Sequence, residues 1–353
     1  MEAACSTRDP ARVTTCGQVA SAGHSDMENL ALDPEFADEF TAEPATPAHV
    51  APTFDIVCAE ANAVLGFCPY TVEDVRSWLT PPPQARAVQL LVREREHDTP
   101  VQWWAALQDP GGQTVYAIVR THPTLPIPAG DRLTAAAYTA LVNWARTECL
   151  PEPGEPGEAL IQAGAAHGND AATRRIQAAG FTYARTLWSM SGTVRDSPPQ
   201  QDEPDQTIKI IAGQDAATMH RILDEGFADH WGYEQLGLDD WLATQQAMAG
   251  HDPSLWRFAE LDGAPVSAMI MSRRVADEGS LYVQELATLA PYRRRGIGAS
   301  LLRHAIDVAR GEGFTKLDLH VDSSNSYDAP ALYRRAGLDV QYAWNAFTMS
   351  LVA

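Results

Sequence analysis

The stretch of sequence that most restricts the fold is a strand-like run, a glycine-containing turn and a helix-like run in direct succession. Residues 285–290 read ELATLA, residues 291–298 read PYRRRGIG, and residues 299–310 read ASLLRHAIDVAR. The first backbone N–H groups of a helix have no partner inside the helix, and the helix dipole adds positive charge there. Gly296 and Gly298 allow a ligand to approach the backbone closely. The pattern therefore predicts a strand–turn–helix unit that binds a pyrophosphate. An ordinary turn with solvated arginines is the alternative.

The three consecutive arginines of this turn contrast with the rest of the chain, whose 353 residues carry a net charge of −20. Arg293, Arg294 and Arg295 predict charge-assisted contacts to the same anion. The acidic balance argues against a nucleic-acid partner, because phosphate backbones attract basic surfaces. It favours a cationic substrate such as an amine, with solubility as the simpler explanation. No apolar run approaches the roughly 18 residues that cross a bilayer, so no membrane contact is expected.

The turn differs from two common phosphate-binding motifs. No G-K-[ST] follows it, and Leu301 stands where the third glycine of a dinucleotide motif belongs. The segment Arg293–Gly298 resembles instead the acetyl-CoA-binding motif [QR]-x-x-G-x-[GA] of the GNAT (Gcn5-related N-acetyltransferase) superfamily. Residues 321–338, VDSSNSYDAPALYRRAGL, resemble a second block of that family. Its positions Asn325, Ala329, Leu332, Tyr333 and Gly337 match. Two motifs in the right order make the resemblance specific over residues 207–353.

The chain contains a weak internal duplication around a polar, acidic and proline-containing stretch at residues 192–206, which predicts a linker. On both sides of it a strand, a long helix and a second strand are followed by Asn, a short helix and an aromatic-rich strand. We expect residues 51–191 to form a degenerate GNAT-like domain and residues 207–353 to form an acetyl-CoA-binding GNAT domain. Residues 1–50 are expected to be a disordered or loosely packed extension. The predicted class is α/β (α+β), with each domain a mixed central sheet flanked by helices.

The first half lacks the cofactor motif. Its corresponding turn reads HPTLPIPAGDRL, where prolines remove N–H groups that a phosphate nest needs, and Ile176 stands where the family has tyrosine. We infer that this half no longer binds the cofactor in the standard way. Whether it binds any acyl-CoA stays open. A tandem chain with one degenerate half resembles actinobacterial proteins of the mycothiol-synthase type. It is also similar to the tandem acetyltransferases of clavulanic acid gene clusters.

The resemblance implies a binding site for acetyl-CoA as cosubstrate and no metal. In GNAT proteins the pantetheine arm lies between two diverging parallel strands and pairs with main chain like an added strand. Ala287, Thr288 and Leu289 are expected to supply that main chain, and an N–H near Leu289 is expected to polarise the thioester carbonyl. The full set of expected cofactor-binding residues is Ala287, Thr288, Leu289, Arg293, Arg294, Arg295, Gly296, Ile297, Gly298, Ala299, Ser300, Asn325, Ala329 and Tyr333.

Three residues are candidates for catalysis. An amine must be neutral to attack, so a base is needed, and Glu285 or His320 is expected to serve as one. Tyr333 stands where the family's thiolate-protonating tyrosine usually lies. The alternatives are a solvated or salt-bridged Glu285, a structural His320 and a Tyr333 that only packs. Because no cysteine follows Cys149, direct transfer in a ternary complex is simpler than an acyl-cysteine route.

Aromatic residues gather in residues 227–241, which wall the acceptor pocket in this fold. The expected substrate contacts are His230, Trp231, Tyr233 and Trp241, and the alternative is that these side chains only close the core. The five cysteines form no C-x-x-C pair. Their spacing argues against a zinc site or a disulfide framework and fits a reducing cytoplasm, so we expect a cytoplasmic protein.

The resemblance implies an acetyl-CoA-dependent N-acetyltransferase acting on a primary amine of a small molecule, including a secondary metabolite or antibiotic intermediate. A mycothiol-synthase-like acetylation of an amino-sugar conjugate is the enzymatic alternative. A non-catalytic acyl-CoA-binding protein is the alternative from another class. The sequence leaves the acceptor, the general base and the oligomeric state open.

Overall fold

The computed structural model describes residues 3–4, 32–150, 159–194, 208–325 and 327–351. These residues form two compact units. Unit 1 comprises the described residues of Met1–Asp9, Arg185–Leu242 and Ala249–Trp344, and unit 2 comprises those of Pro10–Ala184, Ala243–Met248 and Asn345–Ala353. Each unit therefore contains a segment from the other half of the chain. The expected linker lies outside the described residues apart from its first three positions, and the expected domain boundaries stay a prediction.

Unit 2 is built on a mixed sheet in the order β2-β3-β4-β5-β6. The strands are β2 (Phe40–Pro44), β3 (Arg86–Glu94), β4 (Thr99–Gln108), β5 (Thr114–Thr121) and β6 (Leu160–Ala166). The first four pair antiparallel, and β5 and β6 pair parallel. At the end of the chain the N–H of Leu351 donates to the carbonyl of Ala159 (2.9 Å). The last residues thus adjoin the start of β6.

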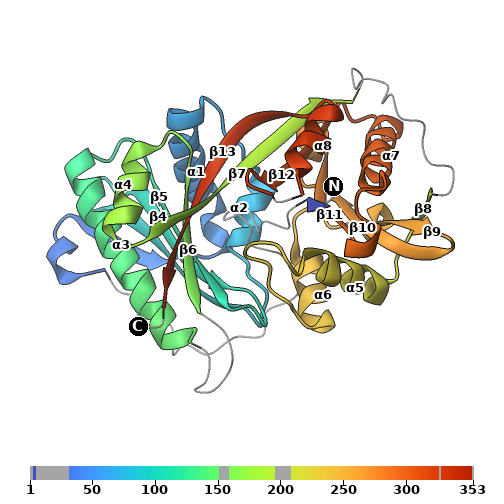
Figure 1. The fold of residues 1–353 in the computed structure, drawn as a ribbon. Coiled ribbons are helices and arrows are strands. Elements are labelled where there is room, and N and C mark those ends of the chain that lie inside the picture. Colours follow the sequence, from blue (N-terminus) through green and yellow to red (C-terminus); the bar gives the residue numbers. More distant parts are fainter. Residues whose placement is uncertain (1–2, 5–31, 151–158, 195–207, 326, 352–353) are drawn as a thin grey trace. The chain divides into compact units, whose positions relative to one another are not determined.

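Helices cover both faces of this sheet (Figure 1). Helices α1 (Val50–Leu65) and α2 (Val72–Trp78) cover one face, and α3 (Ile127–Glu148) and α4 (Asp170–Ala178) cover the other. Consecutive residues of a strand point to opposite faces. The two consecutive buried tryptophans of β4 therefore enter the cores on opposite faces of the sheet. Trp103 stacks on Trp78 of α2 (5.7 Å between ring centroids), whereas Trp104 joins the core beneath α3.

Unit 1 contains the sheet β8-β9-β10-β11-β12-β7. Its strands are β8 (Ile208–Ala212), β9 (Arg257–Leu261), β10 (Ala264–Ser272), β11 (Ser280–Thr288), β12 (Lys316–Asp322) and β7 (Thr182–Thr193). Only β11 and β12 pair parallel among these strands. Asp262 and Gly263 both have positive φ (53° and 78°) and join β9 to β10 in the tight hairpin that the sequence predicts. The two long strands β7 and β13 (Asp339–Ser350) divide between the two units, because residues 182–184 and 345–350 belong to unit 2.

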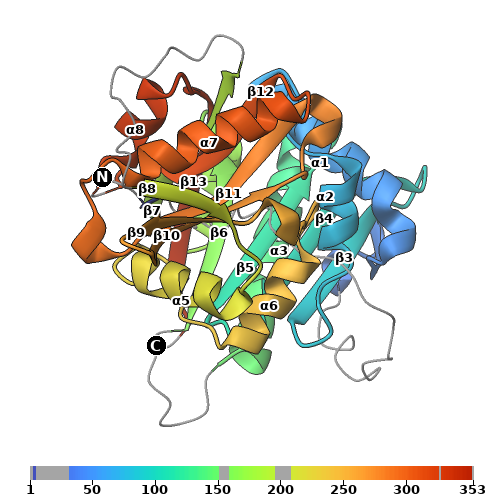
Figure 2. The ribbon, with the colours of Figure 1, turned by 90° about the vertical axis from the view of Figure 1, so that its right-hand side faces the viewer.

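The sheet of unit 1 is also covered on both faces, as Figure 2 shows. Helices α7 (Ile297–Gly311) and α8 (Ala329–Arg335) pack on one face, and α5 (Ala216–Phe227) packs on the other, followed by the start of α6 (Leu238–Ala247). The carboxylate of Asp215 caps α5 by accepting the N–H groups of Ala217 and Thr218. The predicted α/β class with mixed sheets between helices is confirmed.

The expectation of a loose extension through residue 50 is wrong for its last third. Residues 40–44 form β2, and Phe36 and Phe40 are 1% and 3% exposed within the hydrophobic core of unit 2. The two phenylalanine side chains are buried because they pack into the core of unit 2. The acidic composition of the surrounding segment gives no sign of this burial. Residues 5–31 lie outside the described residues.

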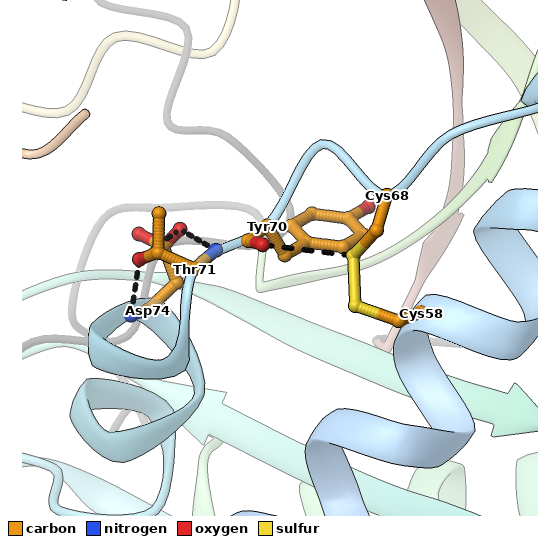
Figure 3. Close-up of a disulfide and its surroundings, with 5 residues drawn as sticks. All are labelled: Cys58, Cys68, Tyr70, Thr71 and Asp74. Atoms are coloured by element: carbon orange, nitrogen blue, oxygen red, sulfur yellow. Dashed lines mark hydrogen bonds between the residues drawn. A yellow bond between two sulfur atoms is a disulfide. The ribbon is translucent and has the colours of Figure 1, made fainter. Parts of the chain in front are cut away.

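The expectation that the cysteines form no disulfide is also wrong. Cys58 of α1 is bonded to Cys68, three residues past the helix end (Figure 3). Gly66, with φ of 81°, ends the helix and turns the chain back toward it. Cys149 is a buried free thiol whose pKa is raised by burial to about 12. Among the described residues no cluster of His, Cys, Asp or Glu is arranged to hold a metal, and no described helix is long and apolar enough to span a membrane.

Candidate active site

Strands β11 and β12 separate from each other halfway along their length. They pair only over Ser280–Val283 and Lys316–Leu319, although β11 runs on to Thr288 and β12 to Asp322. The cause is a bulge: Ile270 of β10 opposes Glu285, whereas the next residue, Met271, opposes Val283. An extra residue in one strand bends that strand and increases its twist. The result is a wedge between two parallel strands, in the place where the family resemblance predicts the pantetheine arm.

The wedge-facing edge of β11 is formed by every second peptide group. The N–H of Leu289 donates to the carbonyl of Val266 in β10 (3.0 Å), and the carbonyl of Ala287 accepts the Ser267 hydroxyl (2.6 Å). Peptide groups alternate in direction along a strand, so those of Leu286 and Thr288 face the wedge. The N–H of Leu289 itself is directed to β10, so among the N–H groups near Leu289 that of Thr288 is the one that faces the wedge, and polarisation of the thioester by an N–H near Leu289 stays a prediction.

This edge accepts an added strand in the structure itself. Ala3 and Ala4 form the short strand β1, which pairs antiparallel with Ala287 and Leu286 of β11. An extended chain with main-chain donors and acceptors thus fits against β11 at the position expected for pantetheine.

The turn after β11 has the geometry of an anion nest. Arg294 and Gly296 both have positive φ (68° and 78°), and Gly296 is the N-cap of α7 with no side chain capping it. A Cβ atom at Gly296 would meet no atom within 4 Å, so the backbone there faces open space. Arg294 and Arg295 are exposed, and Ile297 and Gly298 begin the helix in buried positions. These N–H groups and two cations suit a phosphate ligand.

Arg293 does not fit its predicted role as a phosphate ligand. Its side chain is 7% exposed and turned toward α5, where it donates to the carbonyl of Gly226 (2.8 Å) and to the carboxylate of Asp229 (3.0 Å). A third bond reaches the carbonyl of Thr288 (3.1 Å). The ring of Tyr327 lies beneath the guanidinium, 4.0 Å from it, and the Tyr327 hydroxyl donates to Asp229. Asp229 and Tyr327 carry no motif in the sequence that would mark them as partners of Arg293.

Glu285 and His320 lie on the same face of the sheet. Glu285 opposes Ile270, which packs beneath α5, and directly opposed residues share a face. The neighbours of His320, Leu319 and Val321, pack beneath α7, so His320 points to the opposite face, where α5 lies. Both candidate bases therefore face the predicted acceptor side.

His320 is held between two tyrosines, Tyr282 and Tyr342, that no motif in the sequence marks. The hydroxyl of Tyr282 on β11 lies 3.0 Å from its Nδ1, and the hydroxyl of Tyr342 lies 3.3 Å from its Nε2. The three side chains form a continuous hydrogen-bonded chain across β11, β12 and β13. Such a chain can carry a proton away from a group that reacts near Tyr282.

The residues of the second family block lie around the start of α8. Tyr333 and Ala329 are both 0% exposed and join the core beneath α7 and α8. The carboxamide oxygen of Asn325 accepts the N–H groups of Tyr327 (2.9 Å) and Ala329 (3.4 Å). Asn325 thus shapes the loop before α8, and its contact with pantetheine stays a prediction, as does the acid role of Tyr333.

The four predicted substrate contacts separate into two groups. Trp241 is 6% exposed and packs on Trp256, and the Tyr233 hydroxyl donates to Asp224 (2.9 Å), so both belong to the core around α5. Trp231 lies beneath the guanidinium of Arg185 (5.8 Å). His230 stacks on Tyr327 (5.8 Å between centroids).

His230 differs from the other three in its electrostatics. Its Nε2 is buried and has no hydrogen-bond partner among the described residues. Burial lowers the pKa of His230 to about 4, the Asp229 carboxylate opposes the shift and the Arg293 charge adds to it. The imidazole is therefore neutral near pH 7.

The corresponding region of unit 2 is filled by side chains. Strands β5 and β6 also pair over four residues only, but β5 has no bulge against β4. Arg120, 5% exposed, donates across the strands to the carbonyl of Gly164 (3.5 Å) and pairs with Glu60 of α1 (3.7 Å). Burial raises the pKa of Glu60, although Arg120 opposes this. Arg120 thus bridges β5 and β6 beyond their paired residues, which is consistent with a degenerate site.

The fold and the wedge in unit 1 define an acyltransferase-type architecture, and sequence comparison identifies its family. Residues 216–338 match the sequence model of the acetyltransferase (GNAT) family, so this part of the chain is a GNAT acetyltransferase domain. The resemblance stated from the two motifs is confirmed.

Individual similarities extend over more of the chain. A mycothiol acetyltransferase of Beutenbergia cavernae is 28% identical over 187 residues, which cover 49% of this chain. The matched segment covers 61% of the length of that mycothiol acetyltransferase and 36% of the length of another curated relative, so this chain spans only part of these relatives. The crystal structure of a GCN5-related N-acetyltransferase from Sphaerobacter thermophilus aligns with 89% of this chain and 96% of its own (TM-score 0.71, 21% identity). A tandem GNAT protein from the clavulanic acid biosynthesis pathway aligns with 89% of this chain and 99% of its own (TM-score 0.66, 13% identity). The fold is thus that of tandem GNAT proteins.

Proposed function

We propose that the protein is an acetyl-CoA-dependent N-acetyltransferase that acts on a primary amine of a small molecule. The observation that carries the proposal is the wedge between β11 and β12, which leads directly into the positive-φ turn at Arg294 and Gly296. The residues fit acetyl-CoA: the N–H and carbonyl of Leu286 and the N–H of Thr288 can pair with pantetheine, and the first N–H groups of α7 can bind the pyrophosphate. When bound, acetyl-CoA supplies an activated acetyl group.

The proposed transfer is direct, within a ternary complex. The amine nitrogen attacks the thioester carbonyl, a C–N bond forms, and the C–S bond breaks. The amine loses its proton to a base on the α5 face, and the proposed candidates are Glu285 and His320, which both face that side. The hydrogen-bonded series Tyr282–His320–Tyr342 favours His320 as the base, because each ring nitrogen has a tyrosine hydroxyl partner that can pass a proton. Tyr333 is proposed to return a proton to the departing thiolate.

The acceptor is proposed to be a cationic small-molecule amine, since a net charge of −20 attracts cations. A cytoplasmic location is kept as a proposal, although the Cys58–Cys68 disulfide removes its cysteine-based support. A second candidate is acetylation of an amino-sugar conjugate of the mycothiol type. The 28% identity with a mycothiol acetyltransferase over half of this chain favours it.

The test uses the full chain in two steps. Native mass spectrometry with acetyl-CoA measures binding, and a thiol-release assay with amino sugars, amino acids, peptides and aminoglycosides measures turnover. We expect a bound cofactor and CoA release with at least one amine, strongly reduced in Tyr333→Phe. Absence of acetyl-CoA binding would refute the proposal. Binding without turnover on any amine would favour the non-catalytic acyl-CoA-binding alternative.

A further inference from the structure

The first arginine of the turn is bonded differently from the two that follow it. Arg294 and Arg295 are exposed, whereas the Arg293 side chain is 7% exposed and donates to two separate segments of unit 1, residues 226–229 and the end of β11. Its partners are the carbonyl of Gly226 at the end of α5, the carboxylate of Asp229 after α5, and the carbonyl of Thr288 at the end of β11. We refer to Arg293, Asp229 and Tyr327 as the Arg293 cluster.

The planar guanidinium is needed for this set of contacts. Asp229 receives two N–H groups, one from each terminal nitrogen (3.0 and 3.3 Å), while Nε and Nη2 reach the two carbonyls. An ammonium group has its three donors at one atom and cannot span these acceptors. The flat face of the guanidinium rests on the Tyr327 ring at 4.0 Å, which an ammonium also reproduces poorly.

The Arg293 cluster links the end of β11 and the loop before α8 to residues 227–241, which are predicted to line the acceptor pocket. Thr288 belongs to the strand edge that faces the wedge, and Tyr327 belongs to the loop before α8. Asp229 precedes His230, whose ring stacks on Tyr327 at an interplanar angle of 23°. Fixing Arg293 therefore fixes the position of residues 229–230 relative to the carbonyl of Thr288.

We propose that Arg293 is a positioning residue for the amine acceptor, whereas Arg294 and Arg295 serve the cofactor. The inference rests on the proposed acetyltransferase function. Loss of the cluster releases the segment after α5, so the acceptor binds in a widened and misaligned pocket, whereas β11 stays paired with β10 up to Thr288. The α7 N-terminus keeps its N–H groups and its two exposed arginines, so the cofactor still binds.

The experiment compares Arg293→Lys with Arg294→Lys and Arg294→Ala in the full chain. For Arg293→Lys we expect the acceptor KM to rise at least about tenfold and the acetyl-CoA Kd to change less than about threefold. For Arg294→Ala we expect the reverse. Asp229→Asn and Tyr327→Phe should reproduce the acceptor effect, and combining either with Arg293→Lys should add little, because the residues act as one group. An Arg293→Lys variant that weakens acetyl-CoA and spares the acceptor would overturn the proposal.

Hydrogen exchange separates failure of this inference from failure of the proposed function. If the wild-type protein acetylates no amine, the acetyltransferase proposal fails, but amide exchange still reports the cluster. We expect faster exchange of residues 226–231 in Arg293→Lys and unchanged exchange there in Arg294→Lys. Equal exchange in both variants would show that Arg293 positions nothing.

Discussion

A Cβ atom placed on Gly226 would lie 2.8 Å from the Cβ of Ala287. Two side-chain carbons do not approach so closely in a packed interior. Helix α5 therefore rests on β11 at the residue that neighbours the wedge, and only a glycine allows this distance. The carbonyl of the same glycine accepts a hydrogen bond from Arg293, so the helix end is fixed to the turn as well.

Replacing this glycine tests the contact. Gly226→Ala should push α5 away from β11 and destabilise unit 1 by about 1–3 kcal/mol, as overpacking does elsewhere. We expect weaker acetyl-CoA binding as well, because the edge of β11 shifts. Gly311→Ala is the matched control: this helical glycine has no atom within 4 Å of a Cβ, and alanine there should be neutral or stabilising by about 0.5–1 kcal/mol. Urea unfolding and acetyl-CoA titration provide the measurements. Equal stability of the two variants would contradict the close packing.

Local features of the sequence predict much of the candidate site. The order of strand, turn and helix is set by neighbouring residues, so the turn at Arg294–Gly298 and the Asp262–Gly263 hairpin are found where the patterns indicate them. A nest of N–H groups likewise depends on a few consecutive residues. These parts need no knowledge of distant contacts.

Distant contacts explain what the sequence does not reveal. Asp229 and Tyr327 lie 98 residues apart in the chain, and only the fold brings both to Arg293. The bulge between Ile270 and Met271 sets the direction of each peptide group of β11, and hence makes Leu289 face β10. A one-residue change in pairing cannot be predicted from alternation alone. The Cys58–Cys68 pairing depends on the helix ending at Gly66.

A negative charge in the phosphate nest should weaken cofactor binding. Gly298 is buried in the first turn of α7, and Gly298→Glu brings a carboxylate close to the proposed pyrophosphate site. Like charges a few ångström apart at the protein surface repel by about 2 kcal/mol or more, so the acetyl-CoA Kd should rise at least about thirtyfold. Gly311→Glu places the same charge at the other end of the helix and should leave the Kd unchanged. Isothermal titration of both variants measures the difference, and an unaltered Kd in Gly298→Glu would mean that the turn does not bind the cofactor.

Protonation of His230 should destabilise unit 1 in mild acid. Burial lowers its pKa to about 4 in the folded state, from an ordinary value of 6.5. Between these values the unfolded chain binds more protons, so stability falls as the pH drops from 6.5 toward 4. The loss is on the order of 2–3 kcal/mol. His230→Gln should remove this part of the pH dependence, whereas replacement of the exposed His167 by Gln should not. Urea unfolding at pH 7, 5.5 and 4.5 tests this, and parallel pH profiles of wild type and His230→Gln would contradict it.

Thiol counting tests the disulfide directly. In denaturant, the unreduced chain should show two fewer reactive thiols than the reduced chain, because Cys58 and Cys68 are joined. Closing a loop of about ten residues stabilises a fold by roughly 2–3 kcal/mol in the chain-entropy account, so Cys68→Ser should lower the stability of unit 2 by about that amount. Cys149→Ser serves as the control for the thiol count, since it removes one thiol with and without reductant. Equal counts with and without reductant would show that no disulfide forms.

Strand β1 lies on the edge of β11 that the proposed pantetheine arm would need. Ala3 and Ala4 pair with Ala287 and Leu286, where the proposed cofactor adds its own main-chain hydrogen bonds. Deleting residues 1–9 should therefore tighten acetyl-CoA binding. Two backbone hydrogen bonds contribute about 1–2 kcal/mol in net terms, which corresponds to a Kd lower by about fivefold to thirtyfold. Replacing Ala3 and Ala4 by proline should have the same effect, because proline lacks the N–H that pairing needs, whereas two serines should leave the Kd as in the wild type. If the deletion leaves the Kd unchanged, β1 does not occupy the edge in solution.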